Sequence, residues 1–306
     1  MKTTEKNGYK ISEFTLGTVQ LGMAYGINNS RGMPSSEEAE KILSRAVSGG
    51  IVSFDTARGY DKSEKILGDF FRGKDICKTL ITKVEFESET KAELRASLFA
   101  KTEDSIKKLG VESIPLLHLH TEKYLETYGE ALTSALSELK AEGLVKSVGI
   151  SFSDKSRLLE LCDTDIFDSI QIPANMFDNE EIRNGKISKL SSLGVAVYVR
   201  SVYLQGLFFK DPEELTGNLV SAKGALTKLR RLAEENNMSM ASLALSYMRG
   251  VEGITSLVIG CETEAQLDDS LNLFENPPLG EELVSKINEI SEEVESVILR
   301  PWEWKK

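Results

Sequence analysis

Histidine and cysteine are scarce in this chain of 306 residues. It contains two histidines and three cysteines, and Cys77, Cys162 and Cys261 are widely spaced, with no Cys-x-x-Cys pair. An odd number of scattered cysteines indicates neither a disulfide framework nor a cysteine-based zinc site. We therefore expect a protein of the reduced cytoplasm, in which each cysteine is a small buried hydrophobe rather than a nucleophile.

Long apolar runs and clusters of basic residues are also missing. The first 20 residues contain no apolar segment typical of a signal peptide, and no run of 18 apolar residues occurs, so we expect neither secretion nor a membrane span. Acidic residues outnumber basic ones by 48 to 37, which gives a formal net charge of −11. Nucleic acids and anionic membranes attract clustered Lys and Arg, so we expect neither as a partner.

Glycine-rich phosphate-binding motifs are absent as well. No Gly-x-Gly-x-x-Gly follows the first apolar strand, and no Gly-x-x-x-x-Gly-Lys occurs. A Rossmann or P-loop fold would therefore lack the turn that holds the phosphates. No linker rich in Pro, Gly or Ser divides the chain, which predicts one domain over residues 1–306.

Apolar runs that resemble strands alternate with segments of helical periodicity. The predicted strands are Leu16–Gln20, Ile51–Phe54, Thr79–Thr82, Ile114–Leu119, Ser147–Ile150, Asp168–Ile172, Val195–Val199 and Ser256–Ile259. The predicted helices are one that begins at Ser35 or Ser36 and ends at Gly49-Gly50, then Ser63–Phe71, Lys91–Leu109, Leu125–Glu142, Asp154–Cys162, Glu180–Leu193, Leu226–Glu235, Met240–Arg249, Glu264–Phe274 and Glu281–Ile298.

Eight strand–helix units define the expected fold. Several of the strands are almost continuously apolar, as strands of a parallel sheet covered by helices should be. Eight such units in about 250 residues have the size of a closed (β/α)8 barrel. The predicted fold class is therefore α/β, a single-domain TIM barrel with parallel strands and an extra C-terminal helix.

Ionisable residues follow three of these apolar strands. Asp55 and Tyr60 follow the second strand, Lys83 ends the third and His120 follows the fourth, so all four should meet at the C-terminal mouth of a barrel. A phenol has a reference pKa near ~10, and a neighbouring ammonium lowers it. Asp55 could supply the counter-charge for Lys83, and His120 could polarise a carbonyl oxygen. No Ser-His-Asp or Cys-His set supplies a nucleophile, and a hydride from a cofactor would fill that role.

These motifs resemble a known catalytic set. Asp55-Thr-Ala-x-x-Tyr60, Ile81-Thr-Lys83 and Leu117-His-Leu-His120 resemble the catalytic tetrad of the aldo-keto reductase superfamily. The resemblance implies that Tyr60 is the general acid for reduction and the general base for oxidation. It implies that Lys83 tunes Tyr60, that Asp55 pairs with Lys83 and that His120 orients the carbonyl.

The resemblance covers nearly the whole chain, from Leu16-Gly17-Thr18 to the helix after Gly260. It implies that Ser151 of the fifth strand holds the nicotinamide amide, that Gln171 and Asn175 belong to the sixth strand, that residues 201–206 cover the pyrophosphate and that residues 258–270 hold the adenosine phosphate. The implied cofactor-binding residues are Gly17, Thr18, Asp55, Ser151, Gln171, Arg200, Ser201, Tyr203, Gln205, Gly206, Gly260, Gln266, Asp269 and Ser270. No metal-binding residue is predicted.

Four positions depart from the family pattern. Arg200 stands where an aromatic residue usually stacks on the nicotinamide, although a guanidinium can also stack on a ring. Phe152 replaces a frequent asparagine, Gln266 replaces an arginine that contacts the 2′-phosphate, and a lysine of some members falls at Gly260. The resemblance favours NADP(H) as the cofactor and leaves NAD(H) possible.

The substrate is predicted only by class. The first strand and the Arg-Ser-Val-Tyr-Leu-Gln-Gly segment resemble a bacterial subgroup associated with sugar and polysaccharide biosynthesis. We expect a small carbonyl or sugar-like substrate, and Arg58 and Arg31, if they face the mouth, would favour an anionic one. The sequence does not predict an oligomeric state.

Two other functions fit parts of the sequence. The first is a nicotinamide-nucleotide-binding barrel with a sensor or regulatory role, which would have no use for a phenol tuned by a lysine. The second is a metal-dependent hydrolase, because His118-x-His120 places two histidines on one face of a strand. Such a site would have to complete its ligand set with carboxylates alone.

Overall fold

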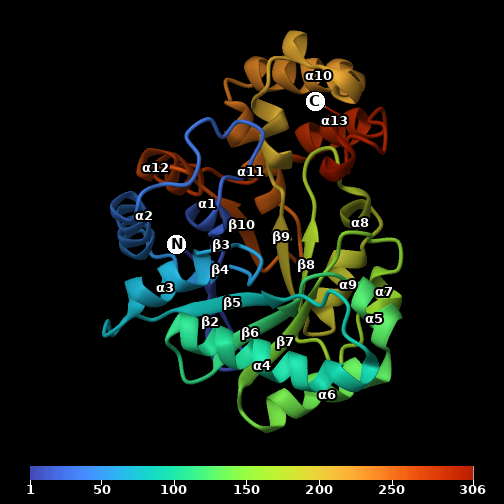
Figure 1. Ribbon diagram of the computed structural model, residues 1–306. Helices are drawn as coiled ribbons and strands as arrows, with labels where there is room; N and C mark the ends of the chain where they lie inside the picture. Colours follow the sequence, from blue (N-terminus) through green and yellow to red (C-terminus); the bar gives the residue numbers. More distant parts are fainter. Residues whose placement is uncertain (306) are drawn as a thin grey trace.

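A closed parallel barrel forms the centre of the computed structural model, which describes residues 1–305. Its strands follow one another in the order β10-β3-β4-β5-β6-β7-β8-β9, and every neighbouring pair is parallel (Figure 1). The strands are β3 (Phe14–Gly17), β4 (Ser53–Asp55), β5 (Thr79–Val84), β6 (Ile114–Leu119), β7 (Val145–Ser151), β8 (Ser169–Pro173), β9 (Ala196–Arg200) and β10 (Ser256–Gly260). The predicted α/β barrel is confirmed.

The α-helices follow the strands and pack around them. They are α1 (Val19–Gly22), α2 (Ser36–Ser48), α3 (Ser63–Phe71), α4 (Lys91–Leu109), α5 (Lys123–Tyr128), α6 (Glu130–Ala141), α7 (Leu158–Leu161), α8 (Glu180–Arg183), α9 (Lys186–Ser192), α10 (Lys223–Glu235), α11 (Met240–Arg249), α12 (Glu264–Leu273) and α13 (Glu281–Ser291). Short 3-10 helices are η1 (Leu204–Phe209), η2 (Pro212–Glu214), η3 (Gly217–Ala222) and η4 (Pro301–Glu303). The extra C-terminal helix, α13, lies beside α10 at one end of the molecule (Figure 1).

Side-chain caps fix where two of the helices begin. Ser35 and Glu38 form a reciprocal capping box at the start of α2, and Thr90 and Glu93 form another at α4. Each box satisfies backbone N–H groups that would otherwise have no partner in the first turn. The predicted beginning of α2 near Ser35 is therefore confirmed.

Glycines divide two helices that the sequence predicts as continuous. The segment Leu125–Glu142 breaks at Gly129, whose φ of 54° and ψ of −133° are accessible to glycine and incompatible with a helix. The segment Glu180–Leu193 breaks at Gly185, which has a φ of 73°. The final helix ends at Ser291 rather than Ile298.

A two-stranded antiparallel hairpin precedes the barrel, and the sequence prediction missed it. It consists of β1 (Thr3–Lys6) and β2 (Tyr9–Ser12). At its turn, the Asn7 amide donates to the Asp168 carboxylate, which directly precedes β8, over 2.9 Å. Tyr9 packs with Tyr198 in a small apolar cluster inside the barrel. The hairpin therefore closes the N-terminal end of the barrel, and the C-terminal end remains as its mouth.

The strands present different side chains to the helices and to the barrel interior. On the helix side, Phe54 of β4 packs edge-on against Phe71 of α3, with 5.0 Å between ring centroids. On the inner side, Thr15 forms hydrogen bonds of 2.8 Å with Ser53 and 2.6 Å with Ser256. A polar interior of this kind can accommodate charged groups near the mouth. No helix within residues 1–305 combines the length and apolar character needed to cross a membrane.

Candidate active site

A buried ion pair lies at the mouth of the barrel. The Nζ of Lys83 donates to both carboxylate oxygens of Asp55, each at 2.7 Å, and to the carbonyl oxygen of Thr56 at 2.9 Å. Burial opposes the charge of Lys83, but attraction to Asp55 and Tyr60 outweighs it and raises the pKa of the ammonium. The site therefore contains a permanent cation that is held by a carboxylate.

The turn after β4 presents Tyr60 to this cation. The backbone N–H of Tyr60 donates to the carbonyl oxygen of Ala57 at 3.0 Å, and the N–H of Ser63 donates to the carbonyl oxygen of Tyr60 at 3.0 Å. Gly22 of α1 passes so close that a Cβ there would overlap the Tyr60 carbonyl oxygen. These contacts place the Tyr60 ring centroid 5.1 Å from the Nζ of Lys83.

His120 completes the group of predicted catalytic residues. Its backbone N–H donates to the carbonyl oxygen of Val84 at 3.1 Å, which fixes the segment beyond β6 against β5. Its ring meets the Tyr60 ring edge to face, with 6.0 Å between centroids, and its Nδ1 contacts the carboxylate of Glu85. The structure thus brings Asp55, Tyr60, Lys83 and His120 together, and their catalytic roles stay predictions.

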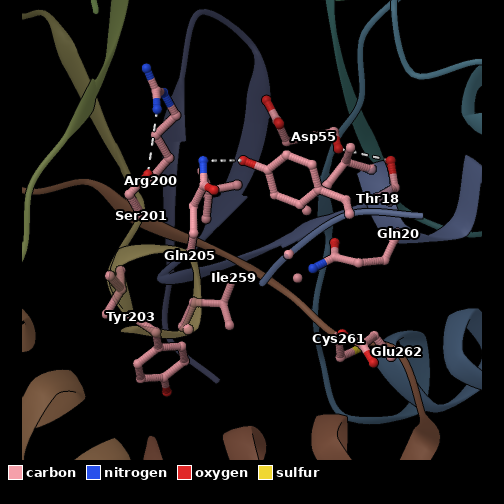
Figure 2. A pocket seen from close by; sticks show the side chains of 18 of the residues that line it. Thr18, Gln20, Asp55, Arg200, Ser201, Tyr203, Gln205, Ile259, Cys261 and Glu262 are labelled. Carbon is pink, nitrogen blue, oxygen red and sulfur yellow. Dashed lines mark hydrogen bonds between the residues drawn. The ribbon is translucent and has the colours of Figure 1, made fainter. Parts of the chain in front are cut away.

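A cavity of about 580 Å³ opens directly over these residues. Asp55, Tyr60 and His120 line it, whereas Lys83 lies beneath its floor. In Figure 2, Asp55 and Arg200 lie on one side of the cavity, and Cys261 and Glu262 lie at the opposite end. The volume is within the usual range for small-molecule and cofactor sites, roughly 300–1,000 Å³.

Every residue that the family resemblance assigns to the cofactor lines this cavity. They are Gly17, Thr18, Asp55, Ser151, Gln171, Arg200, Ser201, Tyr203, Gln205, Gly206, Gly260, Gln266, Asp269 and Ser270. The Thr18 hydroxyl donates to the backbone oxygen of Asp55 at 2.8 Å, which joins β3 to β4 at the rim (Figure 2). Their shared location is a structural finding, and their contacts with a cofactor remain predictions.

Gln171 and Ser151 fit a primary amide such as the nicotinamide carboxamide. They lie opposite each other in the β7–β8 register. The Gln171 amide N–H donates to the Asp55 carboxylate at 2.8 Å, which leaves the amide oxygen of Gln171 as an acceptor. A hydroxyl and an amide oxygen together provide the donor and the acceptor that a carboxamide needs.

Two loops that are distant in sequence meet across the cavity, and the sequence prediction missed this contact. The side-chain amide of Gln205 donates to the Tyr25 hydroxyl at 3.1 Å, and that of Asn28 donates to the carbonyl oxygen of Gly206 at 2.8 Å. Gln205 has a φ of 51°, a strained backbone region for a residue with a side chain. The cavity lining also includes four residues that the sequence did not predict as site residues: Gln20, Tyr25, Asn28 and Glu262.

Arg200 lines the cavity at the end of β9. Its guanidinium donates to the carbonyl oxygen of Phe152 at 3.1 Å and reaches the Ser201 hydroxyl at 3.4 Å (Figure 2). The Phe152 side chain is buried in the apolar layer.

The carboxamide of Asn175 accepts from the N–H groups of Phe177 and Asp178 at 3.0 and 3.1 Å. Asn175 lies outside the lining of this cavity.

Arg58 does not line the cavity, so it does not supply the cation that would favour an anionic substrate. Its guanidinium donates to the carbonyl oxygen of Lys101 at 2.7 Å and to the Asp104 carboxylate at 2.8 Å, both in α4. Arg31 forms an exposed ion pair with Glu38 at 3.6 Å and is not part of the cavity lining. Arg200 is therefore the one lysine or arginine in the lining of the described cavity.

His118 lies below the site rather than in it. It is fully buried, and its Nε2 pairs with the Ser169 hydroxyl at 2.8 Å. Burial, followed by the charge of Lys83, lowers its pKa well below the usual value. Within residues 1–305, no group of three or more His, Cys, Asp and Glu side chains is arranged to hold a metal ion.

The chain is similar to known oxidoreductases. Among curated proteins, the chain is 24% identical to the uncharacterized oxidoreductase YqkF of Bacillus subtilis over 294 residues, which cover 90% of this chain and 92% of that one. It is 23% identical to L-glyceraldehyde 3-phosphate reductase of Escherichia coli O157:H7 over 317 residues, with coverages of 91% and 90%.

Solved structures share the fold. The holo form of the aldo-keto reductase AKR11C1 from Bacillus halodurans matches with a TM-score of 0.79 and 23% identity and covers 96% of this chain and 97% of its own. The glycerol dehydrogenase AKR11B4 from Gluconobacter oxydans matches with a TM-score of 0.74 and 19% identity, with coverages of 94% on both sides. The family model for the aldo/keto reductases matches residues 13–292, and the chain therefore belongs to the aldo/keto reductase family and is an oxidoreductase.

Proposed function

We propose that this oxidoreductase transfers hydride between a nicotinamide cofactor and the carbonyl carbon of a small substrate, with Tyr60 as the general acid and base. The observation that supports this most directly is the position of Tyr60, which lines the cavity with its ring centroid 5.1 Å from the Nζ of Lys83. Asp55 holds the charge of that ammonium. A phenol beside a fixed ammonium can release its proton and take it back, because the ammonium stabilises the phenolate.

The protein's own residues account for the proton in this reaction. The bound cofactor supplies or accepts the hydride. During reduction the O–H bond of Tyr60 breaks and its proton moves to the substrate oxygen, which leaves a phenolate next to Lys83. During oxidation the phenolate takes the alcohol proton. Asp55 keeps Lys83 in place, and His120, whose ring meets the Tyr60 ring edge to face, orients the substrate oxygen.

The charge of the cavity lining bears on the choice between NADP(H) and NAD(H). Glu262 lines the cavity at the end remote from Asp55 (Figure 2), together with Gln266 and Gly260. A carboxylate repels a 2′-phosphate but can accept a hydrogen bond from a ribose hydroxyl. The family resemblance favours NADP(H), whereas this lining favours NAD(H), so we propose that NAD(H) binds at least as tightly as NADP(H).

For the substrate we propose a short polyhydroxylated aldehyde, ketone or alcohol. Two of the similar proteins carry names of this kind, an L-glyceraldehyde 3-phosphate reductase and a glycerol dehydrogenase. Polar side chains that line the same cavity, including Asn28, Gln205 and Ser153, can bind hydroxyl groups. A place in the subgroup associated with sugar and polysaccharide biosynthesis stays a prediction.

Substitution of Tyr60 separates catalysis from a purely nucleotide-binding role. We expect wild-type protein to bind NADH and NADPH in calorimetric titrations and to oxidise one of them in the presence of glyceraldehyde. Tyr60→Phe should keep the nucleotide affinity within about threefold and lower kcat by at least roughly a hundredfold, the usual contribution of a general acid.

Tyr124→Phe is a matched control because it removes the same hydroxyl from a residue of α5 that does not line the cavity. It should behave like wild type. Equal activity of Tyr60→Phe and wild type would refute the proposed role of Tyr60. Binding without turnover in the wild type would favour the sensor or regulatory function, and activity that requires added metal would favour the hydrolase.

A further inference from the structure

We propose that Glu85 is a positioning residue for His120, and that it keeps a proton on Nδ1 of the imidazole so that His120 supports reduction as an imidazolium. The inference deepens the proposed function, because it assigns a role to a residue beside the four predicted catalytic ones. Glu85 is the first residue after β5 and is absent from the cavity lining, so it acts through His120.

Contacts on several sides hold the Glu85 carboxylate against the imidazole. One carboxylate oxygen of Glu85 contacts Nδ1 of His120, and no group among residues 1–305 forms a hydrogen bond of regular geometry with this buried nitrogen. Gly59 lies so close that a Cβ there would overlap the carboxylate. The side chain of Lys101 donates to the Glu85 carbonyl oxygen at 2.6 Å and fixes the backbone.

Glu85 is ionised at neutral pH. The hydrogen bond from His120 lowers the pKa of the Glu85 carboxyl, burial opposes this effect, and the charges of His120, Lys101 and Lys83 lower the pKa further. An ionised carboxylate can only accept hydrogen bonds. Nδ1 of His120 must therefore carry the hydrogen in this contact, which fixes the tautomer of the neutral ring.

The tautomer decides what the other ring nitrogen can do. In the neutral ring with a proton on Nδ1, Nε2 is an acceptor and repels the lone pairs of a carbonyl oxygen. In the imidazolium both nitrogens carry protons, so Nε2 can donate a charge-assisted hydrogen bond to that oxygen. Reduction of a carbonyl therefore requires the imidazolium, whereas the neutral ring suits an alcohol O–H that is about to be oxidised.

Other titratable groups surround the pair. Lys83 on β5 and His118 on β6 lie on the barrel side of His120, and Tyr60 faces its ring from the turn after β4. Lys101 of α4 and Tyr124 of α5 lie next to Glu85, and Arg200 lines the same cavity from β9. Glu85 is the carboxylate in direct contact with the imidazole. Removing its charge should therefore change the protonation of the ring more than removing any other acidic side chain.

The first test compares pH profiles of kcat/KM for carbonyl reduction. In Glu85→Gln the alkaline decline should begin at a lower pH than in wild type, because the variant lacks the carboxylate that contacts Nδ1. Activity at neutral pH should fall roughly tenfold with little change in nucleotide affinity. Glu85→Asp should recover part of the loss. Glu87→Gln is the control, because it removes the same charge from an exposed residue of the same loop.

The second test reads the tautomer directly. Only His118 and His120 contribute ring signals in nitrogen-15 NMR spectra of the histidine-labelled protein, and His120→Asn assigns them. At high pH we expect His120 to carry its proton on Nδ1 in wild type and to lose this preference in Glu85→Gln. A proton on Nε2 in wild type, or identical pH profiles, would overturn the inference. Absence of turnover in wild type would instead refute the proposed function, and the tautomer measurement would still stand.

Discussion

The ammonium of Lys83 lies 2.7 Å from both carboxylate oxygens of Asp55, and the two residues are only 1% and 3% exposed. Gln171 donates a third hydrogen bond to the same carboxylate at 2.8 Å. Two buried opposite charges with additional hydrogen bonds can offset the cost of removing both from water. Each of the two charges would be buried without a counter-charge if the other were removed.

Lys83→Met should both destabilise the protein and abolish turnover. The substitution leaves Asp55 buried without its cation, and breaking such a pair costs about 3–5 kcal/mol in the free energy of unfolding. Denaturant unfolding measures the loss. The double variant Asp55→Asn, Lys83→Met should regain part of this stability but no activity. If Lys83→Met were as stable as wild type, the pair would contribute no net stabilisation.

Gly22→Ala should impair catalysis from outside the cavity. A Cβ at Gly22 would overlap the Tyr60 carbonyl oxygen and approach the Ser63 nitrogen to 2.7 Å, so the turn that carries Tyr60 must shift. A displacement of about 1 Å near reacting groups can lower kcat about a hundredfold. Steady-state kinetics should show this loss with nucleotide affinity nearly unchanged.

Gly224→Ala is the matched control for Gly22→Ala. A Cβ at Gly224, in α10, would have no heavy atom within 4 Å. Alanine in a helix stabilises by about 0.5–1 kcal/mol relative to glycine, so this variant should be fully active and slightly more stable. Full activity of Gly22→Ala would show that the turn adapts without moving the phenol.

The sequence predicted the barrel and the meeting of the four proposed catalytic residues for one physical reason. Parallel strands that follow one another in the chain also lie side by side, so ionisable residues at the ends of consecutive strands must come together. Asp55 and Lys83 are a direct example, since Asp55 is opposite Ile81 in the β4–β5 register and Lys83 lies two residues further on. This part of the site depends only on strand order.

Features that depend on long-range loop contacts were not predictable in this way. A glycine such as Gly129 is compatible with a helical pattern, and its positive φ is visible only in the structure. Arg58 turns toward Asp104 on α4, a choice that local sequence does not specify. The contact between Glu85 and His120 joins two different strand ends, and no motif in either segment indicates it.

Gln266→Arg should increase the affinity for NADPH relative to NADH. Gln266 lines the cavity, where its side-chain oxygen accepts from the N–H of Glu262 at 2.7 Å. A hydrogen bond between a charged guanidinium and a phosphate is worth about 1.5–3 kcal/mol. We therefore expect calorimetry to show a gain of about tenfold or more in the ratio of the two affinities. Glu262→Gln should change the ratio in the same direction, because it removes a repulsive charge.

Glu264→Gln controls for the overall change in charge, since Glu264 is exposed at the start of α12 and does not line the cavity. Its affinity ratio should equal that of wild type. A ratio that changes equally in Glu264→Gln and Glu262→Gln would assign the effect to net charge. No change in Gln266→Arg would place the 2′-phosphate elsewhere.

Glu89→Gln should show a loss of stability that depends on pH. The Glu89 side chain is 16% exposed and accepts hydrogen bonds from Lys101 at 2.5 Å and Ser97 at 2.8 Å. Burial alone would raise the pKa of this carboxyl, but the hydrogen bonds outweigh burial and lower the pKa from 4.5 to about 2. Because the folded protein holds the ionised form, Glu89 stabilises it fully above pH 4.5, and this contribution disappears as the pH falls toward about 2.

Urea unfolding at several pH values tests this linkage. At pH 7 the variant should be less stable than wild type by about 1–3 kcal/mol, the order expected for a shift of this size. The difference should be constant down to about pH 5 and should shrink below it, because protonated Glu89 and glutamine then carry the same charge. Glu87→Gln, on the same loop and exposed, should differ little from wild type at any pH. A deficit for Glu89→Gln that persists unchanged at pH 3 would mean that the stabilisation comes from the shape and packing of the side chain rather than from its charge.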